Sequence, residues 1–428
     1  MLPHLSDGLP ILDIYHSPIA LYFDRADPTN PSTSPSDIAV SLTVREKSRV
    51  VFSSGTWAGS NDGSVYFNLL LRNTFGGAET FNANAAFGTR TRSAYSANFD
   101  APVLSNPDFR WEIAGLASAT NKSWASHEEV LKGGLAKLKY LSSGGHRHEF
   151  SYSGLWRQVT GLAEKASQTV RADAGDSFKS SITHTWTRDR RDYPLLPTRG
   201  YFMKTVAELA GVGPLAGDVA FAKVEAETQA VVPLPIPGFS SASESAVSLT
   251  AGMRAGVLYP LPLGGSTDNP AIAQYSHIND RFILGGPTDV RGFRLAGLGP
   301  HDGGDAVGGD VFAAGGVSLL FPFPRVGKDK PLRLQAFVNG GRLLSLRETE
   351  ANDASKTVNG KGVNNARESV RQTLAQLTDG LPSMAAGVGV VYALPVARFE
   401  LNFSLPLVIR GREQARKGLS LGVGLEFL

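Results

Sequence analysis

The chain has 428 residues, of which 19% are charged and 47 are glycine, so it carries less charge and more glycine than an average soluble domain. Its formal net charge is +3, and its lysines and arginines form no run of the kind that binds the phosphates of a nucleic acid. The absence of cysteine excludes disulfides, cysteine-ligated zinc and a cysteine nucleophile.

No segment of the sequence predicts a membrane-spanning helix. The longest nearly apolar stretch, Met384 to Ala397, contains Pro395 and is shorter than the ~20 residues that such a helix needs. The opening residues, Met1 to Pro10, lack the basic start and apolar core of a secretory signal, so we expect either no secretion or a missing start. A closed barrel is the other structure that crosses a bilayer, because backbone groups that face lipid must be paired.

Residues 1–48 predict a small module that precedes the other strands. Apolar side chains alternate at Ile38, Val40, Leu42 and Val44, after a linker rich in proline and serine. The segment is too short for a complete domain. We therefore expect a partial module over residues 1–48 and a barrel over residues 49–428.

Alternation of apolar and polar residues predicts strands along the rest of the chain. From Arg398 to Leu407 one parity is apolar and suits lipid, while the other is polar and suits water. A soluble β-sandwich alternates in the same way, but its strands are usually near five or six residues long. The sequence predicts roughly sixteen strands, many of them longer than that, which favours an all-β transmembrane barrel with antiparallel strands. The predicted strands are Val50–Trp57, Ser64–Asn73, Thr80–Gly88, Ser93–Phe99, Phe109–Ala119, Val130–Tyr140, His146–Gln158, Phe178–Thr187, Gly200–Val212, Asp218–Val231, Ala246–Leu258, Asp310–Phe321, Arg333–Asn339, Ala385–Leu394, Arg398–Leu407 and Gly418–Phe427.

Two long insertions interrupt the predicted strands. A glycine-rich loop covers residues 260–308, and segments of that length without regular structure are usually functional. A second loop, residues 343–383, contains a predicted helix from Ala366 to Asp379 with a capping-box start at Asn365. Counting strands places both loops at the end of the barrel opposite the N-terminal module.

A motif in the first insertion resembles a known family. Residues 285–293 read Gly-Gly-Pro-Thr-Asp-Val-Arg-Gly-Phe, which is similar to the lid-loop motif of the barrel-assembly superfamily. Residues 189–200 and 308–322 resemble further elements of that family in the same order. The resemblance implies a lid folded into the lumen. It assigns that lid motif to Gly285, Gly286, Val290, Arg291, Gly292 and Phe293.

The chemistry of Arg291 and Gly292 agrees with such a lid. A guanidinium offers five donors in a rigid fork, so it can fix a loop to a polar wall, and glycine allows a sharp turn beside it. Bacterial members usually place acidic residues on that wall, but the matching positions are Ser318 and Asn339. We therefore expect neutral acceptors, or another carboxylate such as Asp289 or Asp310, to hold Arg291.

This departure, together with at most one N-terminal module, makes the chain most like the mitochondrial branch of the family. The resemblance then implies a mitochondrial outer-membrane barrel that folds and inserts β-barrel precursors. Residues 1–48 would be a truncated polypeptide-transport-associated module in the intermembrane space. The implied partners are the precursors, peripheral subunits on the cytosolic face and the lipid bilayer, with a second barrel protein as a further candidate. No cofactor is implied.

The resemblance also implies a weak seam between the first and last strands. Glycines weaken strand packing in the last strand, and an opened seam exposes backbone groups that pair with an incoming strand. The seam residues of the first strand are Val50, Val51, Phe52, Ser53, Ser54, Gly55, Thr56 and Trp57. The family's last-strand signal corresponds to Ser420, Gly422, Leu425 and Phe427.

Other functions fit the sequence less well. Residues 418–422 match a Gly-x-Ser-x-Gly nucleophile elbow, but no room follows Ser420 for the required helix and histidine, so we expect no enzyme. His146 and His148 share a strand face without a third metal ligand, so we expect no metal site. A passive pore, and a barrel that translocates polypeptides, remain the alternative functions.

Overall fold

The computed structural model describes most of the chain. It covers residues 20–25, 34, 37–58, 63–235, 240–241, 244–245, 247–261, 276–323, 331–346, 371–377, 379–394 and 397–424. Across these ranges we find no helix that has both the length and the apolar character needed to cross a membrane. Strands dominate the described structure.

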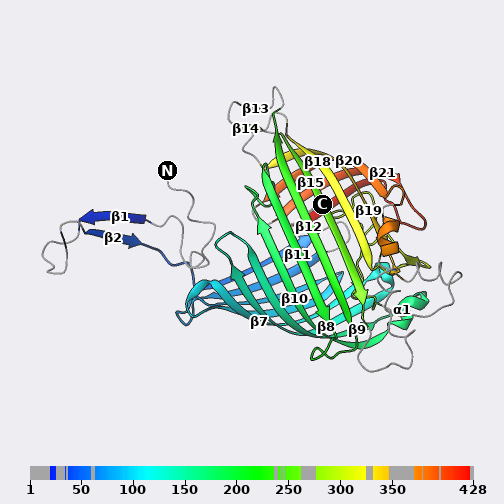
Figure 1. Cartoon of the computed structure of the whole chain (residues 1–428), viewed down its shortest axis with the longest axis horizontal. Helices are drawn as coiled ribbons and strands as arrows, with labels where there is room; N and C mark the ends of the chain where they lie inside the picture. The colour runs from blue at the N-terminus through cyan, green and yellow to red at the C-terminus, as the bar shows by residue number, and fades with distance from the viewer. Residues whose placement is uncertain are drawn as a thin grey trace.

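Sixteen strands form one antiparallel sheet that curves into a barrel (Figure 1). Each strand pairs with the barrel strand that comes next along the chain, so all sixteen predicted strands are confirmed. The strands are β3 (Val50–Ala58), β4 (Gly63–Arg72), β5 (Thr80–Gly88), β6 (Thr91–Val103), β7 (Asn106–Lys122), β8 (His127–Leu141), β9 (Arg147–Thr160), β10 (Gly175–Asp189), β11 (Gly200–Ala210), β12 (Phe221–Leu234), β15 (Val247–Pro260), β18 (Val311–Pro322), β19 (Leu332–Leu344), β20 (Ser383–Leu394), β21 (Ala397–Val408) and β22 (Gly418–Gly424).

The two faces of the sheet follow the predicted alternation. In β21 the side chains of Leu401 and Phe403 are 49% and 45% exposed, whereas Glu400 and Asn402 are fully buried. Successive side chains of a strand point to opposite faces, so the exposed apolar set faces outward and the polar set faces the lumen. The outer face therefore suits lipid, and the buried core lies inside the barrel.

One strand extends well beyond its predicted end. The strand predicted to stop at Asn339 continues in β19 to Leu344, through Gly340 and Gly341. Glycine weakens a strand, which made these positions resemble a strand end. A Cβ atom on Gly341 would lie 2.8 Å from the Leu284 side chain, so this glycine makes room for the loop that packs inside the barrel.

A hairpin precedes the barrel. Strands β1 (Ala20–Arg25) and β2 (Ile38–Thr43) pair antiparallel, and β2 matches the strand predicted at the end of the N-terminal module. The hairpin projects from the end of the barrel opposite helix α1 (Gln168–Ala172) (Figure 1). The module over residues 1–48 stays a prediction, because much of it lies outside the described residues.

The long loops leave the barrel at the end that carries α1 and the 3₁₀ turn η2 (Ser123–Ala125), as their places in the antiparallel order require. The first loop joins β15 to β18 and contains a small hairpin, β16 (His301–Asp302) and β17 (Asp305–Ala306). The second contains helix 371–377, while the rest of the predicted helix includes residues outside the described ranges. At the opposite end, β13 (Ser240–Ser241) pairs with β14 (Glu244–Ser245).

Candidate functional site

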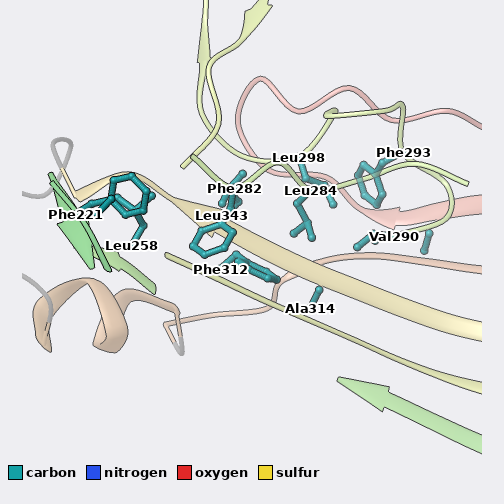
Figure 2. Close-up of a cluster of buried hydrophobic side chains, with 12 residues drawn as sticks. Phe221, Leu258, Phe282, Leu284, Val290, Phe293, Leu298, Phe312, Ala314 and Leu343 are labelled. Atoms are coloured by element: carbon teal, nitrogen blue, oxygen red, sulfur yellow. The ribbon is translucent and has the colours of Figure 1, made fainter. Parts of the chain in front are cut away.

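The lid, defined as residues 276–309, fills part of the lumen with an apolar cluster. Phe282, Leu284, Val290, Phe293 and Leu298 come from the lid and are each at most 6% exposed. Figure 2 shows them against side chains of the inner wall. Those wall residues are Phe221, Leu258, Phe312, Ala314 and Leu343. The burial of this apolar surface stabilises the packing of the lid against strands β12 to β19.

Arg291 is the charged anchor of the lid. Its side chain is 1% exposed, and its Nε donates a hydrogen bond of 3.0 Å to Glu400 Oε2 on β21. The guanidinium also lies 4.8 Å above the ring of Phe337. Glu400 is 2.5 Å from Arg398 Nη2 and accepts a bond of 2.8 Å from Asn402 Nδ2. One buried carboxylate thus serves two guanidiniums, which makes it costly to remove.

Asp289 and Asp310, which were candidate carboxylates for holding Arg291, have other hydrogen-bond partners, and Glu400 is the carboxylate that binds its side chain. Asp289 pairs with Arg254 at 3.1 Å and accepts a bond from the Gly285 amide at 2.9 Å. Asp310 accepts hydrogen bonds from the Ser276 and Ser345 hydroxyls. Glu400 lies on a strand that the family comparison of wall positions did not consider, although the alternation already placed it on the lumen face.

The two predicted wall residues contribute differently. Asn339, with its amide oriented by its partners, accepts a bond of 2.9 Å from the Arg291 amide and donates one of 3.2 Å to the Arg291 carbonyl oxygen. Ser318 accepts a bond of 3.1 Å from Gln335 Nε2. The neutral acceptor therefore holds the backbone of Arg291, while Glu400 holds its side chain.

Both the backbone conformation and the close packing at position 292 require a glycine. Its φ is +88°, a conformation that L side chains rarely adopt, and an added Cβ would lie 2.5 Å from the Ala385 side chain. Gly285 and Gly286 also have positive φ, of 105° and 134°. Gly292 thus lets the lid pack closely against β20, whereas Gly285 and Gly286 allow turns within the lid.

The lid backbone pairs with the segment that leads into β22. Phe293 forms an isolated antiparallel bridge with Ala415. The Arg294 amide donates to the Gln414 carbonyl oxygen at 3.0 Å, and the Arg416 amide donates to the Gly292 carbonyl oxygen at 2.8 Å. No local pattern in the sequence indicated this pairing.

A second charged anchor fixes the start of the lid to the opposite wall. Asp280 is buried and lies 2.6 Å from Arg157 on β9 and 3.5 Å from Lys179 on β10. Its carbonyl oxygen accepts a bond of 2.9 Å from Lys223 on β12. The lid is therefore held at two walls, and the sequence reasoning missed this second site.

The β16–β17 hairpin at the far end of the lid docks on α1. Asp302 accepts bonds from the amide and hydroxyl of Thr169, at 3.1 and 2.8 Å. These hydrogen bonds lower the pKa of Asp302, because they stabilise its charged form. Asp305 accepts bonds from Ser126 Oγ at 2.5 Å and from the Ser167 amide at 2.7 Å.

A turn enters the lumen from the other end of the barrel. Leu195 and Leu196, between β10 and β11, pack with Leu320 and Val391. Arg398 donates a bond of 3.4 Å to the Leu195 carbonyl oxygen, so the Arg398–Glu400 pair links this turn to the Arg291 anchor. The lumen is thus occupied from both ends.

The two ends of the sheet are β3 and β22. Every other barrel strand has a neighbour on each side, but within the described residues no ladder joins β3 to β22. The predicted seam residues 50–57 all lie in β3, where Val50 and Phe52 are 62% and 66% exposed. Ser420 and Gly422 lie in β22, whereas Leu425 and Phe427 lie outside the described residues.

The structure also places the residues that were considered for catalysis and metal binding. Ser420 lies within strand β22, so it is not at the strand-to-helix turn of a nucleophile elbow. His146 accepts a bond of 3.2 Å from Trp186 Nε1, and His148 Nδ1 lies 3.3 Å from His184 Nε2. In the described part of the chain, no three His, Cys, Asp or Glu side chains are grouped to hold a metal ion.

Known proteins resemble the chain over most of its length. A family model described as the Omp85 superfamily domain matches residues 73–427. A SAM50-like protein of Schizosaccharomyces pombe is 39% identical over 393 residues, which are 92% of this chain and 75% of that protein. The sorting and assembly machinery component 50 homolog of Xenopus tropicalis is 32% identical over 399 residues, or 92% of this chain and 76% of that protein.

Solved structures agree at the level of the fold. BamA from Haemophilus ducreyi, lacking POTRA domains 1–3, superimposes with a TM-score of 0.72 at 12% identity and covers 96% of this chain and 76% of that one. CdiB from Acinetobacter baumannii gives a TM-score of 0.55 at the same identity, covering 97% of this chain and 66% of that one. At such low identity these likenesses concern the fold alone.

Proposed function

This chain belongs to the Omp85 superfamily, and from that membership we propose that it folds and inserts β-barrel precursor proteins into the mitochondrial outer membrane through a seam between β3 and β22. The Xenopus tropicalis relative is described as a homolog of a sorting and assembly machinery component, which supports this activity over covalent catalysis.

The observation that carries the proposal is the sheet order, which begins at β3 and ends at β22 with no described ladder between them. An edge strand presents unpaired backbone donors and acceptors, and another strand can add to it. In this proposal, the last strand of a client takes the place of β22 beside the seam residues, Val50 to Trp57. Client hairpins then accumulate until the new barrel closes.

The client is recognised, in this proposal, by a last strand like the chain's own. Ser420, Gly422, Leu425 and Phe427 supply the pattern of a polar residue, a glycine and two hydrophobic residues. Short β22 (Gly418–Gly424) contains three glycines, which weaken strand packing and make its displacement easier.

The relatives' names also support the proposed location and partners. The barrel would lie in the mitochondrial outer membrane, with residues 1–48 as a partial polypeptide-transport-associated module in the intermembrane space. Peripheral subunits would bind the cytosolic loop end, with helix 371–377 as one contact. A second barrel protein is a further candidate partner at the lipid-facing surface.

The filled lumen argues against a passive pore and against a chain passing through it. A translocated polypeptide would have to displace the lid, including the buried pairs of Arg291 with Glu400 and of Asp280 with Arg157. Leaving one member of a buried ion pair buried without its partner costs about 3–5 kcal/mol. Insertion at the seam leaves both pairs intact.

Site-specific disulfide crosslinking tests the proposal. Single cysteines are placed along β3 and β22 of the membrane-embedded protein, which is then given an arrested barrel precursor with a cysteine in its last strand. We expect register-dependent crosslinks from the precursor to β3 and loss of the β3–β22 crosslink. Crosslinks confined to lumen-facing positions would support translocation instead. A β3–β22 crosslink that persists without any client crosslink would support a lidded pore.

A further inference from the structure

The side chain of Tyr66 on β4 lies across the edge strand β3. Tyr66 pairs directly with Gly55 of β3, and two positions further along β4 is Asn68, whose amide faces the lumen. Side chains two positions apart share a face of the sheet, so Tyr66 also faces the lumen. A Cβ atom added to Gly55 would lie 2.6 Å from the Tyr66 hydroxyl oxygen and 2.7 Å from its Cζ. The phenol therefore occupies the space that a side chain at position 55 would need.

The ring of Tyr66 reaches the free side of β3. Gly55 is half-buried, whereas Ser53 on the same face of β3 is exposed. A glycine weakens a strand, and an aromatic side chain from the neighbouring strand can cover it. Within the described residues β3 has no neighbour on its other side, so a strand that adds there lies directly beyond Gly55. The Tyr66 hydroxyl would then lie beside the lumen-facing side chains of the added strand.

The closed part of the barrel contains the same arrangement of three strands. Phe337 on β19 lies over its partner Gly387 on β20, where an added Cβ atom would be 2.6 Å from the ring. The residue beyond Gly387, on β21, is Ser404. Phe312 lies over Gly256 in the same way, and the residue beyond Gly256 is Glu225. In both cases the third strand places a polar residue beside the ring.

Strand geometry indicates which client residue would meet the hydroxyl. If the midpoints of β3 and β22, Ser54 and Leu421, lie opposite each other, Ser420 lies opposite Gly55, because antiparallel strands run in opposite directions. Ser420 faces the lumen, since it pairs with the buried Asn402. Cβ atoms of directly opposite residues are about 4.5–5.5 Å apart. One polar atom beyond the client's Cβ therefore comes within hydrogen-bond distance of the Tyr66 oxygen.

We propose that the Tyr66 hydroxyl forms a hydrogen bond across Gly55 with the polar residue of a client's last strand, at the position of Ser420. The inference rests on the proposed insertion at the seam and adds a specificity-determining residue to it. A hydroxyl or amide side chain at that position pairs with the phenol, whereas an aliphatic side chain cannot. Tyr66 thus favours clients whose last strand carries a polar residue there, and Gly55 provides the space for the contact.

The test uses the full chain, with Ser54→Cys in β3, in phosphatidylcholine vesicles. Two synthetic peptides copy residues 414–428 with a cysteine in place of Leu421, and one of them also carries Ser420→Ala. One neutral hydrogen bond contributes about 0.5–1.5 kcal/mol, so we expect the serine peptide to crosslink about two- to tenfold more than the alanine peptide. Serine peptides with the cysteine in place of Leu419 or Val423 should crosslink less, because they are out of register.

Two variants of the protein separate a hydrogen bond from a structural role of the ring. Tyr66→Phe keeps the ring over Gly55 and removes only the hydroxyl, so the serine and alanine peptides should crosslink equally. Gly55→Ala displaces the phenol and should also abolish the preference. Tyr95→Phe, on the lipid-facing side, and Gly115→Ala, where the nearest atom is 4.0 Å from the added Cβ, are the matched controls and should keep it.

The outcomes distinguish this inference from the proposed insertion. Equal crosslinking of the two peptides to the protein with Tyr66, or a preference for serine that survives Tyr66→Phe, would overturn the inference while the seam stands. Stronger crosslinking through position 419 or 423 would also overturn it, because another residue would then lie opposite Gly55. If no peptide crosslinks to β3 in any register, the proposed insertion fails as well.

Discussion

Two regions of the barrel have the same strand architecture but are stabilised differently. One is the wall that contacts the lid, and the other is the set of strands at the start of the sheet. Wall residues Phe337 and Glu400 are 3% and 0% exposed beneath Arg291. On the same face of β3, by contrast, Ser53, which pairs with Asn68, is exposed, and the strand has one described neighbour. The first region is stabilised like the core of a soluble protein, whereas the second depends on one strand ladder and on lipid.

The inner faces of the two regions explain this difference. Near the start of the sheet, the lumen carries an amide ladder in which Asn68 Nδ2 donates to Asn82 Oδ1 at 2.8 Å and to Asn84 Oδ1 at 2.5 Å. Near the lid, buried ion pairs and aromatic rings fill the lumen instead. Opening β3 therefore leaves the lid contacts in place, so a barrel can have an easily opened edge and a firmly seated lid at once.

Removing the shared carboxylate should have the largest effect. Glu400→Ala leaves Arg291 and Arg398 without their buried partner, so we expect unfolding from lipid vesicles to be easier by about 3–5 kcal/mol. Urea titration measures this change, and protease cleavage in the lid reports its release. Glu128→Ala is the matched control, since its partner Arg92 is 69% exposed, and should cost at most about 1 kcal/mol. Equal losses in both variants would remove the contrast between wall and surface pairs.

Hydrogen exchange compares the local stability of the two regions directly. An edge strand opens without breaking the rest of the sheet, so the amides of β3 should exchange on the order of a hundredfold faster than those of β19. The measurement is made on the protein in vesicles, by mass spectrometry after proteolysis. Similar exchange in both strands would mean that the seam is closed as firmly as the wall.

Gly292→Ala should weaken the lid without touching a charge. The positive φ and the close Ala385 side chain both oppose a Cβ atom, so we expect a loss of about 2–4 kcal/mol in stability. Gly303→Ala is a matched control in the same lid, because its φ is also positive, +61°, but nothing lies within 4 Å of the added Cβ. If the two variants lose equal stability in urea titration, the close packing against β20 contributes nothing.

The smallest expected effect is a pH dependence at the far end of the lid. The pKa of Asp302 lies below its ordinary 3.8, so its bonds to Thr169 stabilise docking above that pH and are lost as pH falls through the lowered value. We expect less than about 1 kcal/mol, because the pair is partly exposed. Exchange of the Thr169 amide between pH 2.5 and 5 reports the change. Asp302→Asn should show no such step, and an identical step in that variant would assign it to another group.

The strands could be predicted because their signal is local. Within each strand, side chains that face lipid alternate with side chains that face the lumen. In β21 this alternation can be recognised from its twelve residues alone. The partner of Arg291 could not be predicted in this way, because it depends on which wall the lid meets. One partial signal was available: the predicted strands from Asp310 to Phe427 contain three acidic residues, Asp310, Glu400 and Glu426, and Glu400 is the one that lies within the described strands β18 to β22. The pairing of Asp280 with Arg157, across 123 residues, had no such signal.

The bridge between the lid and the segment before β22 joins two parts of the chain that are synthesised at different times. Ala415 follows Phe293 by 122 residues (415 minus 293), and Glu400 is likewise made long after Arg291. At ~5–20 residues per second, a ribosome would leave the newly made lid without these partners for roughly 6–24 s. During that time Phe293 lacks its bridge to Ala415, and Arg291 lacks its carboxylate partner. The nascent chain therefore needs protection from aggregation until its last strands emerge, and the lid reaches its place only as the barrel is completed.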